Sequence, residues 1–340
     1  MERRGFLKAG TAGLASLLAG SGLLTWSPRS EAATISRTFY ITAGTQTMPD
    51  GVSVYVKGYS DSAADLNVPS TPIICQEGDT LSITVINRLA VTHNFVIGGL
   101  EAGDPPLASS GDIPPGGSRT VTLTVPSGSA GSYLFYDDKT AFNRFLGLHG
   151  GLAIMPAGKS DELYPGSPKF RKQLFWVFND IDPALNRAVQ QGTSIPSMFT
   201  PMYFTINGLT SRPPGAPGHG DPTRDALYDP RSQLSGVIGD RTLVRMLNPG
   251  MCAHAMHVHA NHMEWLTDRG SVRPQIWMKD TIHVRNALGK ADAIFPFVAP
   301  PDAYPPVTQG HYPMHLHDEM SQTAGGGLYQ FGAMTEIIFK

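Results

Sequence analysis

Two clusters of histidines stand out among the eleven histidines of this 340-residue chain. The first lies in residues 254–262 and the second in residues 311–317. Because side chains alternate between the two faces of a strand, His257 and His259 would share one face, and so would His315 and His317. Two facing strands can direct these four imidazoles toward one point, and imidazole binds copper, zinc, iron and nickel. The sequence therefore predicts a metal site in the second half of the chain.

Sulfur-containing side chains lie close to these clusters. Cys252 precedes His254 by two residues, and it could bind copper, pair with Cys75 or remain a buried free thiol. A structural zinc site is the weaker interpretation, because the two cysteines do not pair in sequence and the histidines exceed four. Met256 and Met314 are either neighbours of the metal or ordinary core residues.

Composition indicates which elements position the clusters. Hydrophobic residues make up 41% of the chain and charged residues 16%, and the 37 glycines and 28 prolines separate short apolar runs. This pattern is typical of an all-β protein with turns between short strands. The formal net charge of −2 gives no reason to expect nucleic acid as a partner.

An internal repeat relates the two halves of the chain. In each half an aspartate is followed by an asparagine eight residues later and by a histidine six residues after that. The two sets are Asp79, Asn87 and His93, and Asp240, Asn248 and His254. The two sets are 161 residues apart. A period of that length is too long for a solenoid and predicts two related Greek-key β-sandwich domains. We place the first domain at residues 34–160 and the second at residues 170–340.

The first 33 residues have the features of an export signal. Arg3 and Arg4 precede an apolar run rich in alanine and glycine, and Ser30-Glu31-Ala32 resembles a cleavage site. The segment resembles a twin-arginine signal peptide, which predicts a periplasmic or otherwise exported protein. No later apolar run approaches membrane-spanning length, so we expect no membrane span in the mature form.

The histidine segments resemble motifs of the multicopper oxidase family. Residues 254–259 (HAMHVH) are similar to its His-Pro-x-His-Leu-His motif, and residues 312–327 are similar to its last His-Cys-His segment. Residues 131–136, 204–208 and 278–281 are also placed as in that family.

The resemblance implies two cupredoxin domains and copper as the cofactor. It matches His257 to a type 2 copper ligand, with His93 as the second. The type 3 ligands it matches are His259, His315 and His317, and His254 matches a type 1 ligand.

Departures from the family pattern affect the other copper ligands. Leu316 takes the place of the type 1 cysteine, and Ser321 takes that of the second type 1 histidine. Phe95, Tyr136 and Asp138 stand where further type 3 histidines would be expected. Asp138 and Tyr136 could still offer oxygen ligands, or could be ordinary strand and turn residues.

The sequence therefore predicts an exported copper-binding protein, interpreted as a copper oxidoreductase without the type 1 blue site. Its partner would be a small-molecule substrate or an electron donor. The alternatives are a periplasmic copper-holding or copper-handling protein and a metal-free cupredoxin scaffold.

The resemblance also implies an assembly. Two-domain members of the family form homotrimers, so His93 of one chain could face the histidine clusters of the next. The alternative is a site closed within one chain, which would leave a monomer. The remaining histidines are weaker ligand candidates and are His149, His219, His262, His283 and His311.

Overall fold

The structure is a computed structural model that describes residues 16–17, 24–25, 27, 29–101, 103–300, 308–329 and 331–340. The arginine pair of the predicted export signal lies outside the described residues. In the part of the chain that is described, no helix is long and apolar enough to cross a membrane.

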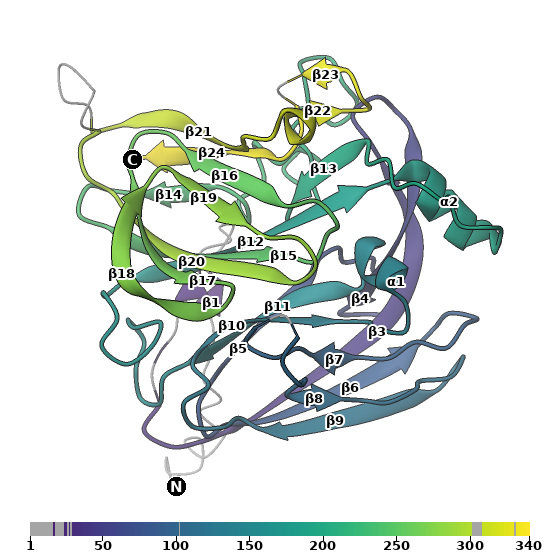
Figure 1. The fold of residues 1–340 in the computed structure, drawn as a ribbon, viewed down its shortest axis with the longest axis horizontal. Coiled ribbons are helices and arrows are strands. Elements are labelled where there is room, and N and C mark those ends of the chain that lie inside the picture. Colours follow the sequence, from purple (N-terminus) through teal and green to yellow (C-terminus); the bar gives the residue numbers. More distant parts are fainter. Residues whose placement is uncertain are drawn as a thin grey trace, which may run out of the picture.

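The first half of the chain forms a sandwich of two sheets, which lies in the lower part of Figure 1. One sheet has the order β4 (Ser53–Ser60), β3 (Thr34–Thr47), β6 (Thr80–Asn87) and β9 (Ser118–Thr124). The other has the order β5 (Ser70–Gln76), β11 (His149–Met155), β10 (Gly131–Tyr136), β7 (Val96–Ile97) and β8 (Ala108–Ser109). The parallel pairs β3–β6 and β5–β11 require crossovers between the sheets.

The second half forms a larger sandwich. Its first sheet has the order β18 (Ser271–Lys279), β17 (Met263–Asp268), β20 (Gly289–Pro296), β15 (Arg241–Asn248), β12 (Lys172–Ile181), β13 (Tyr203–Ile206), β22 (Thr323–Ala324) and β23 (Leu328–Tyr329). The short strands β1 (Ser16–Leu17) and β2 (Leu24–Thr25) join it at β12. Its second sheet has the order β14 (Leu234–Gly236), β24 (Met334–Phe339), β21 (Gly310–Leu316), β16 (His254–Val258) and β19 (Thr281–Val284).

Helices are short and lie beside the sandwiches. They are α1 (Ala141–Phe145), α2 (Pro183–Gln191) and a 3₁₀ helix at Glu319–Gln322. Asp182 caps α2 by accepting from two backbone N–H groups, and Gly192 ends it with a φ of 66°. The all-β prediction with two sandwiches is confirmed, whereas the domain limits at residues 34–160 and 170–340 stay predictions.

Burial patterns show how the sandwiches pack. Residues of β6 alternate between buried and half-buried, as expected of a strand with one face on a core. In contrast, β20 is buried throughout and β12 is buried after its first residue, Lys172. An apolar cluster that includes Leu134, Met155, Phe175 and Leu243 joins residues of both halves. The two sandwiches are therefore packed against each other through buried sheet faces.

The repeated asparagines explain the internal repeat. The Asn87 side chain donates to the carbonyl oxygen of Val91 at 2.7 Å, and the Asn248 side chain donates to that of Cys252 at 2.8 Å. Each asparagine also accepts a backbone N–H from the residue two positions later at 2.9 Å. The same side chain thus holds the same turn after β6 and after β15.

Candidate metal centre

Strand register places the predicted ligands. Strands β16 and β21 are antiparallel neighbours, and His257 lies directly opposite His315. Alternation turns these histidines to the outer face of the sheet, while the residues between them point inward. Those inward residues are Met256, Val258, Met314 and Leu316, all 0–1% exposed in the core of the second sandwich.

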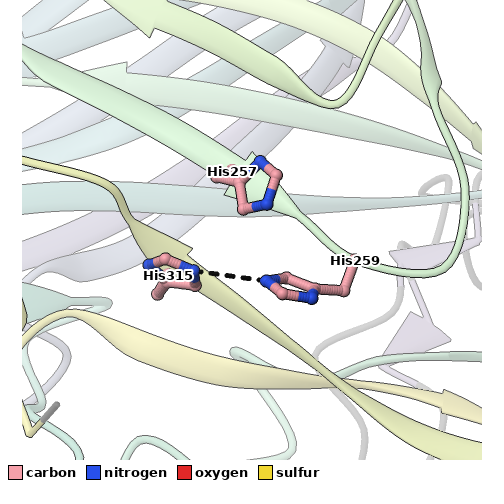
Figure 2. A group of neighbouring side chains, drawn as sticks. All are labelled: His257, His259 and His315. Atoms are coloured by element: carbon pink, nitrogen blue, oxygen red, sulfur yellow. Dashed lines mark hydrogen bonds between the residues drawn. The ribbon is translucent and has the colours of Figure 1, made fainter.

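Three imidazoles converge on this outer face. The ligand nitrogens of His257, His259 and His315 all lie within 4.8 Å of one another. Nε2 of His259 is 3.3 Å from Nε2 of His315, as the dashed line in Figure 2 marks. Two nitrogens that each bind one ion at about 2.0–2.1 Å must lie within about 4.2 Å of each other. The Nε2 atoms of His259 and His315 meet this limit, whereas the 4.8 Å bound on the whole set is slightly larger. The three nitrogens therefore form a candidate site for one metal ion of the kind that imidazole prefers.

Hydrogen bonds on the far side of two rings orient them. Nδ1 of His257 lies 2.9 Å from the hydroxyl oxygen of Thr281 on β19, and Nδ1 of His315 lies 3.4 Å from the carbonyl oxygen of Leu316. Donation from Nδ1 to these oxygens leaves the Nε2 lone pair for a metal. The carboxylate of Asp280 is 3.9 Å from Nδ1 of His257 and adds a nearby negative charge.

Electrostatics keep the cluster neutral. Partial burial lowers the pKa of His257 and of His259, and the neighbouring imidazoles lower both further. Burial and the other histidines lower the pKa of His315 to about 4, although its contact with the Leu316 carbonyl opposes the shift. Since a metal binds only the unprotonated nitrogen, the site is ready for metal at neutral pH.

Replacing Thr281 with valine should weaken copper binding. Valine keeps the shape of threonine but removes the oxygen that fixes the His257 ring. Loss of such an outer partner typically costs about 10–100-fold in metal affinity, and we expect that loss in a competitive copper titration. Thr281→Ser keeps the hydroxyl and should bind nearly as the wild type does. Equal affinity of the valine and serine variants would disprove the orienting role.

His317 lies beside this group without being one of its three members. Its ring centroid is 5.2 Å from that of His257 and 5.4 Å from that of His315. The side chain is exposed, at the end of β21. The structure thus brings four of the six predicted histidines to one surface, three of them with converging nitrogens.

His254, which the resemblance matches to a type 1 ligand, lies outside the cluster. It is 1% exposed, and its Nε2 is 2.8 Å from Asp180 on β12. Its Nδ1 is 3.5 Å from Asp318. Burial alone would lower the pKa of His254, but the two carboxylates raise it to about 9. A protonated imidazole has no lone pair for a metal, so His254 ties β16 to β12 instead.

His93 is placed in the other sandwich. It is fully buried, and its Nδ1 is 2.6 Å from the carboxylate of Asp137. The same carboxylate accepts from the Asn143 amide, which in turn accepts from the Lys57 ammonium group. His93 and His254 are thus equivalent members of the repeat, and each binds a buried aspartate. In this chain the structure does not bring His93 to the histidine cluster.

The substituted ligand positions are occupied by packing residues. Leu316 and Phe95 are 0% exposed within the two cores, and the hydroxyl of Ser321 donates to the carbonyl of Asp318. Asp138 accepts from the side chain of Asn94, and Tyr136 lies under the guanidinium of Arg144. These contacts agree with the interpretation of Tyr136 and Asp138 as ordinary strand and turn residues.

His149 is buried in β11 and is expected to cause acid sensitivity. Its Nδ1 donates to the carbonyl of Arg144 at 2.8 Å, and its Nε2 has no hydrogen-bond partner among the described residues. Burial lowers the pKa of His149 to about 4, against an ordinary value of 6.5. The unfolded chain therefore takes up this proton first as the pH falls. Titration of His149 therefore leaves the free energy of unfolding unchanged above pH 6.5 and lowers it as the pH falls from about 6.5 to 4.

Asparagine at this position provides the test. His149→Asn keeps a donor near Nδ1 but cannot take up the proton. Between pH 7 and about pH 4.5 the free energy of unfolding of the wild type should fall by about 2 kcal/mol more than that of the variant. Urea unfolding at both pH values measures this difference. Parallel pH dependences would show that His149 does not titrate as described.

The other sulfur and histidine candidates lie apart from the converging nitrogens. Cys75 and Cys252 are both free thiols, so the predicted disulfide alternative is not formed. Met256 and Met314 are core residues. The remaining histidines are engaged elsewhere or exposed on strands and turns: His219 lies beside Asp225, His311 contacts Glu336, and His262 and His283 are exposed.

A small cavity adjoins the cluster and contains side chains that the sequence did not single out. It has a volume of about 160 Å³ and is lined by His259, Pro313, His315, Gln322, Gly332 and Met334. Met334 lies opposite His315 in the pairing of β21 with β24. Strand alternation alone could have found Met334 only if the register of β24 had been known.

A model of the multicopper oxidase family matches residues 50–159. Among solved structures, multicopper oxidase mgLAC is 20% identical, with a TM-score of 0.65 over 90% of this chain and 86% of its own.

Two structures from Nitrosomonas europaea are similar as well. The blue copper oxidase is 17% identical, with a TM-score of 0.66 over 90% of this chain and 85% of its own. The copper nitrite reductase is 16% identical, with a TM-score of 0.60 over 90% and 94%. At these identities the likeness establishes the fold. No curated protein matches the chain.

Proposed function

We propose that this protein is a copper oxidoreductase, because a model of the multicopper oxidase family matches residues 50–159 and the described part of the chain has a cupredoxin-like fold. Copper would be held by His257, His259 and His315, with His317 beside them. The observation that carries the proposal is the 3.3 Å approach of the two Nε2 atoms in a set of three neutral imidazoles.

Bound copper supplies one-electron transfer and binding of small oxygen-containing ligands. The chain's own residues determine how such a site would work. Thr281 orients the ring of His257 through its contact with Nδ1, and the exposed His259 leaves one side of the site open to a ligand. Gln322 presents an amide in the adjoining cavity of about 160 Å³.

The proposed enzyme has no type 1 blue site. Leu316 fills the cysteine position with an alkyl chain inside the core, and an alkyl chain cannot replace a thiolate. Electrons would therefore reach the histidine-bound copper from a donor that contacts the open side of the cluster directly. A small-molecule reductant or substrate could reach the copper from that side.

Spectroscopy combined with a turnover assay tests the proposal. Copper-loaded protein should show a Cu(II) paramagnetic signal with imidazole nitrogen couplings and no intense thiolate-to-copper band. It should also consume dioxygen in the presence of a one-electron donor, and His259→Ala should lose that activity. An intense blue band would identify an unexpected thiolate ligand, and copper binding without turnover would favour the second candidate.

The second candidate is a copper-holding or copper-handling protein. The exposure of His259 and His317 favours it, since an open site can release its ion to an acceptor. Rapid copper transfer to a chelator, without dioxygen consumption, would support this function. A metal-free scaffold is the third candidate, and failure of the purified protein to bind copper would favour it.

Export and assembly also remain proposals. We infer a periplasmic or otherwise exported protein from the twin-arginine segment, which fractionation of cells expressing the full chain can test. A homotrimer remains the proposed assembly, with small molecules rather than nucleic acid as partners. In such a trimer, the burial of His93 beside Asp137 leaves the cluster of each chain to bind copper with its own histidines. Light scattering at micromolar concentration distinguishes a trimer from a monomer.

A further inference from the structure

We propose that the thioether of Met334 is an additional copper ligand that raises the affinity of the histidine cluster for Cu(I). The inference rests on the proposed copper site at His257, His259 and His315. The three histidines alone can bind Cu(II), whereas a sulfur ligand would increase the affinity for Cu(I).

The position of Met334 follows from strand pairing. Strand β24 is the antiparallel neighbour of β21, and Met334 lies directly opposite His315. Its neighbours along the strand, Thr335 and Ile337, are both 0% exposed and point into the core. Alternation therefore turns Met334 to the same outer face as His315.

The cavity beside the cluster is lined in part by the side chain of Met334. Met334 lines the same space of about 160 Å³ as His259 and His315, the two residues whose Nε2 atoms are 3.3 Å apart. Among the described residues, the rest of the lining is Pro313, Gln322 and Gly332. None of these three side chains carries a charge, so none of them repels a metal ion.

Core filling does not explain this methionine. Inward methionines usually serve as flexible packing residues, and Met256 and Met314 on the same sheet do so at 0% exposure. Met334 is instead half-buried beside two imidazoles. Its side chain lines the same cavity as two imidazoles that can bind a metal.

Ligand softness predicts the consequence. Thioether sulfur prefers Cu(I), whereas Cu(II) is satisfied by nitrogen and oxygen ligands. A site with imidazoles and one thioether should therefore bind both oxidation states, with the sulfur strengthening only the reduced one. Removal of the sulfur should change the two affinities unequally.

The test compares Met334→Leu with the wild type and with Met198→Leu. Leucine has nearly the same volume as methionine but no sulfur, and Met198 is 74% exposed on the loop between α2 and β13. Affinity for Cu(I) is measured without oxygen against a Cu(I) chelator, and affinity for Cu(II) is measured separately. X-ray absorption of the Cu(I) form then reports whether sulfur is bound to copper.

Met334→Leu should weaken Cu(I) binding at least about tenfold, as loss of a ligand should cost no less than loss of an outer partner. Its Cu(II) affinity should stay close to that of the wild type, and the copper–sulfur signal should disappear. Met198→Leu should change none of these quantities. Unchanged Cu(I) affinity together with no copper–sulfur signal in the wild type would overturn the inference while leaving the histidine site intact. Failure of the wild type to bind either ion would overturn the proposed function as well.

Discussion

Replacing His257 and His315 together with alanine is expected to abolish tight copper binding. The two residues face each other across β16 and β21, and only His259 of the converging group would remain. Loss of one outer partner already costs about 10–100-fold in metal affinity. Loss of two direct ligands should therefore lower the affinity by at least about 10³-fold. Isothermal titration or competition with a chelator measures the change.

A matched control separates ligation from general effects of histidine removal. His283 and His311 are exposed histidines of the same sheet, and they lie outside the converging group. His283→Ala with His311→Ala should leave copper affinity unchanged. Both double variants should unfold at nearly the wild-type temperature, because none of the four side chains is fully buried. Copper binding that survives loss of His257 and His315 would place the site elsewhere.

Replacing Arg245 with methionine is expected to cost about 3–5 kcal/mol of stability. Arg245 is fully buried on β15, and burial lowers its pKa to about 10, which leaves it charged at neutral pH. It donates to Gln173 and to Ser132, each at 2.8 Å. The hydroxyl of Ser132 donates in turn to Asp292, which also accepts from Thr267.

This network crosses between the two sandwiches, since Ser132 belongs to β10 and Arg245 belongs to β15. Without the guanidinium, the buried carboxylate of Asp292 would lose one of the positive charges that act on it, and the ammonium of Lys290 would be left as the other. Adding Asp292→Asn to Arg245→Met should therefore recover part of the lost stability. Arg119→Met, which changes an exposed arginine, should alter stability by less than about 0.5 kcal/mol. Chemical unfolding that shows Arg245→Met within about 1 kcal/mol of the wild type would contradict this description.

Periodicity in the sequence was sufficient to predict which histidines share the outer face of the site. His257 and His259, and likewise His315 and His317, are two residues apart, and a strand must turn such pairs to one side. The repeated aspartate, asparagine and histidine spacing similarly predicted two related sandwiches. The structure adds that Asn87 and Asn248 form equivalent turns.

Contacts between distant segments could not be predicted in this way. His254 is three residues from His257 and so points to the opposite face, but its partner Asp180 lies 74 residues away. His93 meets Asp137 across 44 residues. Each aspartate gives a buried histidine a structural role, which no local pattern reveals. Met334 could not be predicted for a related reason, because only the pairing of β21 with β24 places it beside His315.

Crystallography of the copper-loaded protein with data collected at the copper absorption edge tests the central claim most directly. An anomalous peak within bonding distance of Nε2 of His259 and of His315, and close to His257, is the result we predict. A peak at His254 or His93 with none at this cluster would contradict the proposed site.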